Sequence, residues 1–207
     1  MITNHLDNFV SRQKVQKDLL WRIQSDFEFL MEIKEYNKKR KLDTHLYYLA
    51  ILTRNDMILL TSHLISQSSD EYSFTKSIKI LGHLKKTFSR DTQILYSNLL
   101  EDLNVIRALF KELSFVDIRN THIAHIDRKR VPYKFEWAKA EHGIGLLFKF
   151  YNDMSTCVGE PTIARKSAID LSLFIRQDKT YRKISDFALN LIKSNYQVGL
   201  EIIKQLE

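Results

Sequence analysis

Apolar side chains recur at spacings of three and four residues through most of this chain, and this periodicity restricts its fold more than any other feature. The spacing places apolar groups on one stripe of a helix, and such stripes normally pack into a core. Only 5 glycines and 2 prolines occur among the 207 residues, whereas sheet folds with many tight turns usually need more of both. The sequence therefore predicts an all-α fold, a helical bundle of five to seven helices.

The apolar stripes also indicate where the helices lie. They predict helices over residues of roughly 8–36, 42–66, 74–88, 91–118, 135–158 and 180–206. Ser89-Arg90-Asp91-Thr92 can end one helix and cap the next, and Gly159-Glu160-Pro161 should end the helix before it. Residues 162–179 leave two alternatives open, a short helix or an extended arm.

No internal repeat or long linker divides the chain. We therefore expect residues 1–207 to form one helical domain, in which 159–207 would be a C-terminal helical extension. The N-terminus lacks a basic region followed by an apolar core, and no apolar run approaches the ~18 residues of a membrane span. The protein is expected to be soluble and cytoplasmic and to bind no membrane.

The formal net charge is +7 at pH 7, from 32 lysines and arginines against 25 aspartates and glutamates. A basic excess of this size is compatible with a polyanionic partner but does not require one. Cys157 is the only cysteine, so no intramolecular disulfide can form, which fits a reducing compartment. We interpret it as a small buried or half-buried side chain, because its neighbours in sequence offer no activating base.

One segment, Arg119 to Asp127 (RNTHIAHID), combines groups that can cleave RNA without a metal. Such cleavage needs a base for the 2′-hydroxyl, an acid for the leaving 5′-oxygen and a cation for the phosphorane. Histidine suits the proton transfers because its pKa lies near neutrality, and arginine binds phosphate through two parallel hydrogen bonds. Arg119, His122 and His125 supply these groups. Asn120 can donate to a phosphate oxygen or orient an imidazole.

The spacing of these residues sets a condition on how they could meet. Arg119 and His125 are six positions apart, which puts them about 120° from each other around a regular helix. They would converge only at a distorted helix end, or across the axis of a symmetric dimer in which the same helix contributes twice.

Arg119-Asn120 followed by His125 resembles the Arg-x(4–6)-His motif of the HEPN superfamily (higher eukaryotes and prokaryotes nucleotide-binding). The stretch from Ile118 to Asp127 is similar to the signature of abortive-infection-type members, although His122 has no fixed place in that pattern. The resemblance implies a HEPN-like helical bundle and a metal-independent endoribonuclease, acting as a toxin or antiphage effector. It further implies a homodimer with a composite cleft. A toxin would also need control, for example by an antitoxin protein.

Carried over by position, the resemblance implies that Arg119 binds the scissile phosphate of RNA and that His125 is the general acid or base. Asn120 would position the phosphate or the imidazole, and His122 would assist. Asp127 could orient a histidine or pair with Arg119. The alternative is a network of structural contacts at a helix end, in which Arg119 pairs with an aspartate and the histidines satisfy backbone groups.

Basic residues follow the motif and would draw in RNA by counterion release: Arg128, Lys129, Arg130 and Lys134. A solvated loop is the simpler interpretation of this charge run. Tyr133, Phe135 and Trp137 could stack bases, although Trp137 also fits the core stripe of its helix. No HExxH or CxxC pattern and no fourth ligand accompany the histidines, so we expect no metal and no other cofactor.

Gly143-Ile144-Gly145 is not a phosphate loop, because the strand, the third glycine and the lysine of such a loop are missing. We expect these glycines to permit close contact between helices instead. His142 beside them is expected at the surface or in packing.

Two other functions stay open beside the nuclease. One is a catalytically inactive HEPN-like helical module that binds RNA, a nucleotide or a partner protein through the same surface. The other is a structural dimer of helices with no role in nucleic-acid binding.

Overall fold

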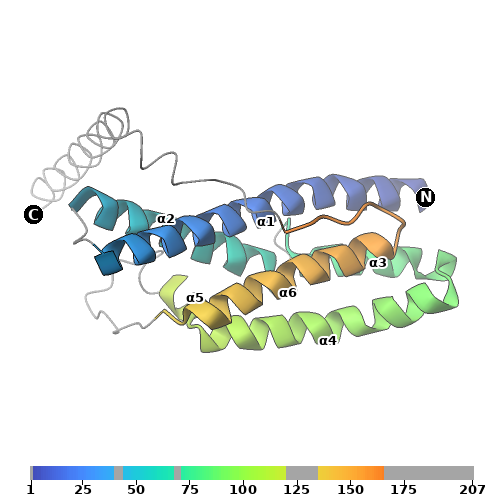
Figure 1. Cartoon of the computed structure of the whole chain (residues 1–207). Helices are drawn as coiled ribbons and strands as arrows, with labels where there is room; N and C mark the ends of the chain where they lie inside the picture. The colour runs from blue at the N-terminus through green and yellow to red at the C-terminus, as the bar shows by residue number, and fades with distance from the viewer. Residues whose placement is uncertain (1, 40–43, 68–70, 120–134, 166–207) are drawn as a thin grey trace, which may run out of the picture.

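The computed structural model describes residues 2–39, 44–67, 71–119 and 135–165. All regular secondary structure within these ranges is helical, and the long helices lie alongside one another as a bundle (Figure 1). In chain order the elements are α1 (Ile2–Lys39), α2 (Thr44–Leu64), α3 (Phe74–Leu84), the 3-10 turn η1 (Lys85–Thr87), α4 (Arg90–Glu112), α5 (Phe115–Ile118) and α6 (Trp137–Thr156). The predicted all-α helical bundle is thereby confirmed.

The 38-residue helix α1 is the spine of the bundle, because it packs against α2, α3 and α6 (Figure 1). Its predicted apolar stripe is buried: Leu20 and Ile23 are 0% exposed and Phe27 is 2% exposed. The helix begins earlier than the sequence predicts, and Phe9 near its start is also fully buried. Burial of this stripe removes several large side chains from water, and each contributes about 1.5–3 kcal/mol.

Polar side chains interrupt the buried stripe of α1, and they bond to other parts of the bundle. Gln13 donates from Nε2 to Ser155 Oγ of α6 at 2.8 Å. Gln16 donates from Nε2 to Tyr72 O and to Ser77 Oγ of α3, both at 2.9 Å. Because a buried polar group without a partner costs about 1–3 kcal/mol, these bonds fix the positions of α3 and α6 along α1.

The predicted cap at the start of α4 and the predicted end of α6 are confirmed. Ser89 precedes α4 and accepts a hydrogen bond from Thr92 N at 3.2 Å, as expected of a capping residue. Gly159, with a φ of 74°, follows the C-terminal end of α6. Cys157 beside it is 5% exposed, and burial raises the pKa of its thiol to about 11. The cysteine is therefore the buried side chain that the sequence predicts.

The predicted single helix over 91–118 is wrong, since the structure divides it. α4 ends at Glu112, and Ser114 adopts a left-handed backbone with a φ of 55° before the short helix α5 begins. Apolar residues lie on both sides of the break, and Phe110 and Phe115 are both buried. Side chains that face the core on both sides of a corner leave no sign of the corner in the pattern.

Several predicted elements lie outside the described residues. They include the loop suggested by the basic run that starts at Arg128, and the helix over 180–206. Of the segment 162–179, residues 162–165 are described and have no regular secondary structure. None of the helices in the described ranges is long and apolar enough to cross a membrane.

Arg107 of α4 stabilises the connection between α2 and α3 through hydrogen bonds. Its guanidinium donates to Ile65 O at 2.7 Å and to Ser66 O at 3.0 Å, and it also contacts Thr75 Oγ1 at the start of α3. Partial burial lowers the pKa of Arg107, which still remains charged at neutral pH. No sequence pattern indicates this contact, because the main acceptors are backbone oxygens far away along the chain.

α6 approaches α4 closely at Gly143. A Cβ built on this residue would lie 2.8 Å from Cζ of Phe110, whose side chain is 0% exposed. A Cβ on Gly145 would come no closer than 3.7 Å, to Nη1 of Arg165. The predicted close contact between helices is therefore confirmed at Gly143, where the lack of a side chain lets the Phe110 ring lie against the backbone.

We expect Gly143→Ala to destabilise the protein by about 1–3 kcal/mol, because the buried Phe110 ring leaves no room for the added methyl group. This loss opposes the gain of about 1 kcal/mol that alanine normally brings inside a helix. Gly145→Ala in the same helix is the matched control and should be neutral or stabilising. Urea denaturation of the three proteins measures both effects, and equal stability of the two variants would contradict the packing argument.

Candidate functional site

The described part of the predicted motif begins at the corner between α4 and α5. Ser114 N donates to Lys111 O at 2.8 Å, which closes the last turn of α4. Ile118 N donates to Ser114 O at 2.9 Å, which starts α5 from the same residue. Ser114 thus ends one helix and begins the next, and its left-handed backbone sets the change of direction.

The corner places α5 against α2 and α4. Phe115 and Ile118 bury the inner side of this short helix, with exposures of 1% and 4%. Arg119 directly follows Ile118 and is half-buried. The arginine of the motif therefore directly follows a short helix whose apolar side is buried in the core.

The remaining predicted site residues lie outside the described residues: Asn120, His122, His125, Asp127, Arg128, Lys129, Arg130 and Lys134. Tyr133 lies there as well. Of the predicted constellation, Arg119 is the member that the described structure places. The convergence of Arg119 with His125 stays a prediction.

An aromatic cluster lies at both ends of the segment that carries the motif. The Phe115 ring lies 5.1 Å from that of Phe110 and 6.2 Å from that of Phe135, measured between ring centroids. Phe115 stands one turn before Arg119, and Phe135 is the first described residue after the segment 120–134. The described residues on the two sides of that segment are therefore close together in space.

Trp137 extends this cluster towards α1. Its ring lies 4.6 Å from that of Phe135 and 6.2 Å from that of Phe27 on α1. Lys34 Nζ of α1 lies 4.9 Å from the centroid of the Trp137 ring, at the distance of a cation–π contact. These contacts leave Trp137 half-buried and favour its interpretation as a core residue over that of a base-stacking residue.

A second group of titratable side chains, which the sequence reasoning missed, lies between α1 and α2. Arg22 Nε of α1 lies 2.7 Å from Asp56 Oδ2 of α2, and Asp26 lies one turn after Arg22. Burial, together with the charge and hydrogen bond of Asp56, raises the pKa of Asp26 to about 7, against the opposing effect of Arg22. The Asp26 carboxyl therefore changes between its protonated and ionised forms near neutral pH.

The composition of α2 contains the signal that could have revealed this group. Arg54 and Asp56 are the only two charged side chains in its 21 residues, and charges within an otherwise apolar helix need partners. The pattern does not say which helix supplies them. Within the described ranges, no group of three or more His, Cys, Asp or Glu residues is arranged to hold a metal ion.

Comparison of the chain with protein-family models, curated proteins and solved structures finds no match. The HEPN resemblance therefore depends on the residues around Arg119 and His125. The all-α bundle is compatible with that resemblance and does not test it.

Ser114→Gly should stabilise the protein by about 1 kcal/mol, because glycine adopts a left-handed backbone without the steric cost of a side chain. In a chain of this length the gain corresponds to a rise in Tm of about 2–4 °C. Ser114→Val should lower Tm, since a branched side chain is strained in this conformation. Calorimetry of the three proteins makes the measurement, and a lower Tm for Ser114→Gly would contradict the role of the corner.

Asp26 should make the protein less stable as pH rises from about 4 to about 7. In the unfolded chain its carboxyl ionises near its ordinary pKa of 3.8, whereas the folded protein retains the proton until the pH reaches about 7. Its contribution to the free energy of unfolding therefore falls across this range and stays low above it. Asp26→Asn removes the titration, so its stability relative to the wild type should be greater at pH 8 than at pH 5.

Urea denaturation at the two pH values measures this change. Asp18→Asn provides the control, because Asp18 is exposed on the same helix. The stability of that variant relative to the wild type should not depend on pH. A pH-independent difference between Asp26→Asn and the wild type would contradict the raised pKa of Asp26.

Proposed function

We propose that this protein is a metal-independent endoribonuclease of the HEPN type that acts as a toxin or antiphage effector. The observation that carries the proposal is the segment from Arg119 to Asp127, in which Arg119, Asn120 and His125 follow the pattern of such nucleases. The all-α bundle and the formal net charge of +7 are compatible with it. A cytoplasmic location, a homodimer and a controlling antitoxin belong to the same proposal.

In the proposed reaction, the 2′-hydroxyl of RNA attacks the adjacent phosphorus atom. One imidazole accepts the proton of that hydroxyl while a bond forms between the 2′-oxygen and phosphorus. The bond from phosphorus to the 5′-oxygen breaks, and a second group donates a proton to that oxygen. The products are a 2′,3′-cyclic phosphate and a 5′-hydroxyl. One proton passes from the RNA to the first group, and one passes from the second group to the RNA.

The residues of the motif divide this work among them. His125 would carry out one proton transfer, and His122 or the His125 of a second copy would carry out the other. Arg119 would bind the phosphate and stabilise the charge that builds on the phosphorane. Asn120 would orient the phosphate or an imidazole, and Asp127 would hold a histidine in position.

The surroundings of Arg119 support its proposed role. Its backbone follows the buried residues of α5, and its side chain is half-buried, so fewer conformations compete with the one that binds phosphate. Rate enhancement by positioning depends on such restriction. Phe135 packs on Phe115, one turn before Arg119, so the described residues on both sides of the segment that contains the two histidines lie close together.

The basic run after the motif would supply affinity without sequence specificity: Arg128, Lys129, Arg130 and Lys134. Contacts of this kind release counterions from the RNA backbone, so binding weakens as the salt concentration rises. Selection among RNA molecules would then come from other contacts, such as those to unpaired bases.

The test is cleavage of total RNA in EDTA by the wild-type protein, Arg119→Ala and His125→Ala, with analysis of the product ends. We expect the wild type to leave 2′,3′-cyclic phosphate ends. Each variant should lose at least about a hundredfold in rate, because His125→Ala removes a general acid or base and Arg119→Ala removes the charge that stabilises the phosphorane. His142→Ala, which alters an exposed histidine on α6, is the control and should keep full activity.

Full activity of both Arg119→Ala and His125→Ala would contradict the proposed site. Binding of RNA without cleavage by the wild-type protein would favour the catalytically inactive module instead. Circular dichroism of the variants distinguishes loss of chemistry from loss of fold.

A further inference from the structure

One face of α2 carries a regular row of four side chains, three of which are apolar and exposed. Four residues follow one another at intervals of four, three and four positions: Tyr48, Leu52, Asn55 and Leu59. This is the spacing with which a helix in a coiled coil meets its neighbour. Tyr48 is 47% exposed, Leu52 50% and Leu59 38%. These four residues form the α2 seam.

The composition of α2 does not suit a helix that faces water along this seam. Its 21 residues include only two charged side chains, Arg54 and Asp56, and Asp56 is paired with Arg22 of α1. A surface helix of a soluble protein normally turns a charged face to water, whereas a helix that is apolar on two sides is covered on two sides. α2 therefore has the composition of a helix with a further partner besides α1 and α5.

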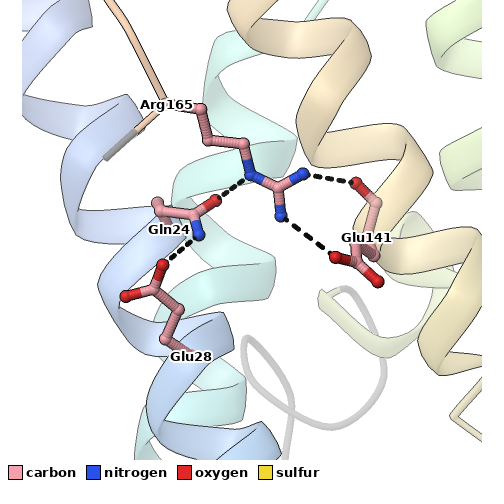
Figure 2. A network of polar contacts seen from close by, with 4 residues as sticks. All are labelled: Gln24, Glu28, Glu141 and Arg165. Atoms are coloured by element: carbon pink, nitrogen blue, oxygen red, sulfur yellow. Dashed lines mark hydrogen bonds and ion pairs between the residues drawn. The ribbon is translucent and has the colours of Figure 1, made fainter. Parts of the chain in front are cut away.

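The described chain ends at Arg165, which is held between α1 and α6. Asn152 of α6 holds the backbone of Ile163 through two hydrogen bonds. Its side chain donates to Ile163 O at 3.0 Å and accepts from Ile163 N at 2.8 Å. Arg165 Nε then donates to Gln24 Oε1 of α1 at 2.6 Å (Figure 2). Its guanidinium also lies 3.8 Å from Glu141 Oε1 of α6 (Figure 2). The point from which the C-terminal segment departs is therefore fixed.

The segment after Arg165 is long enough to reach the α2 seam. Gln24 and Asp26 lie about 200° apart around α1, so the chain must pass around α1 to reach the side where Asp26 meets α2. α1 is about 10–12 Å wide with its side chains. Residues 166–179 can span about 46–50 Å when extended, which is several times that width.

The sequence beyond residue 179 has the pattern of a partner for the seam. The predicted helix over 180–206 carries apolar residues with heptad spacing on one stripe: Ile184, Phe187, Leu191 and Val198. At 1.5 Å per residue this helix would be about 40 Å long and α2 is about 32 Å long. The two stripes could therefore be in contact along the whole seam.

We propose that residues 180–206 dock as an amphipathic helix on the α2 seam of the same chain. The covalent link through Arg165 favours this occupant over a second copy, because a short tether gives an effective concentration in the millimolar range. Docking covers Tyr48, Leu52 and Leu59, and each Å² of apolar surface removed from water contributes about 25 cal/mol. The inference is independent of the proposed nuclease function.

Hydrogen exchange of the full chain, followed by mass spectrometry, tests the proposal. The amides of 180–206 should exchange at least about tenfold more slowly than in an unstructured peptide. Leu52→Asp should abolish this protection, because the seam cannot bury an unpaired carboxylate. Leu100→Asp, which alters a residue on α4 that is 54% exposed, should retain it. Protection of α1 in each variant shows that the bundle is folded.

Fast exchange of 180–206 in the wild-type protein would overturn the proposal, as would protection that survives Leu52→Asp. Protection that is lost on dilution, together with a dimer in light scattering, would overturn it in favour of a second copy on the seam.

A cross-linking experiment gives a second measurement that does not depend on destabilising the seam. Cys157 is 5% exposed, so a Leu52→Cys/Leu191→Cys variant presents two new accessible thiols. Both positions lie near the middle of their helices and meet in either orientation of the docked helix. A short bismaleimide should link them within one chain, and Leu100→Cys/Leu191→Cys should give no such link. Links that form only between chains would overturn the proposal.

Discussion

Burial of the α1 stripe is the interaction on which the rest of the bundle depends. α1 packs against α2, α3 and α6, and α4 packs against α3 and α6 in turn. Burial of the apolar side chains stabilises the bundle but does not depend on one exact arrangement of the helices. Gln13 and Gln16, in contrast, each form a hydrogen bond with one particular neighbouring helix. A shift of α1 by one turn would leave these amides unpaired, at a cost of about 1–3 kcal/mol for each. Apolar burial thus makes α1 central, and amide pairing sets its register.

The parts of the fold that follow from local chemistry could be predicted, and those that depend on distant partners could not. The stripe containing Leu20 and Phe27 is local, as is the cap at Ser89, and the structure confirms both. The corner at Ser114 left no trace, because apolar residues face the core on either side of it. Arg107 was also missed, since its acceptors are backbone oxygens that every residue carries.

The same division applies to the candidate site. Arg119 could be predicted from the chemistry of its side chain and its neighbours in sequence. The contact between Phe115 and Phe135 could not, because the residues between them have no apolar periodicity that indicates it. Asp26 shows how local reasoning can point in the wrong direction. Arg22, one turn before it, lowers the pKa of Asp26, whereas burial against α2 raises it and prevails. The degree of burial is a property of the packed helices and cannot be read from neighbours in sequence.

α2 connects the features that bear on function, because it supports α5, pairs with α1 through Asp56 and carries the exposed seam. A helix docked on the seam would influence Arg119 only if α2 had two arrangements that differ in their contact with α5, since a rigid helix transmits no preference. Asp26 lies at the interface that such a movement would change, and its proton is exchanged near neutral pH. The effect of a helix docked on the α2 seam on Arg119 would therefore depend on pH if the two arrangements of α2 buried the Asp26 carboxyl to different degrees.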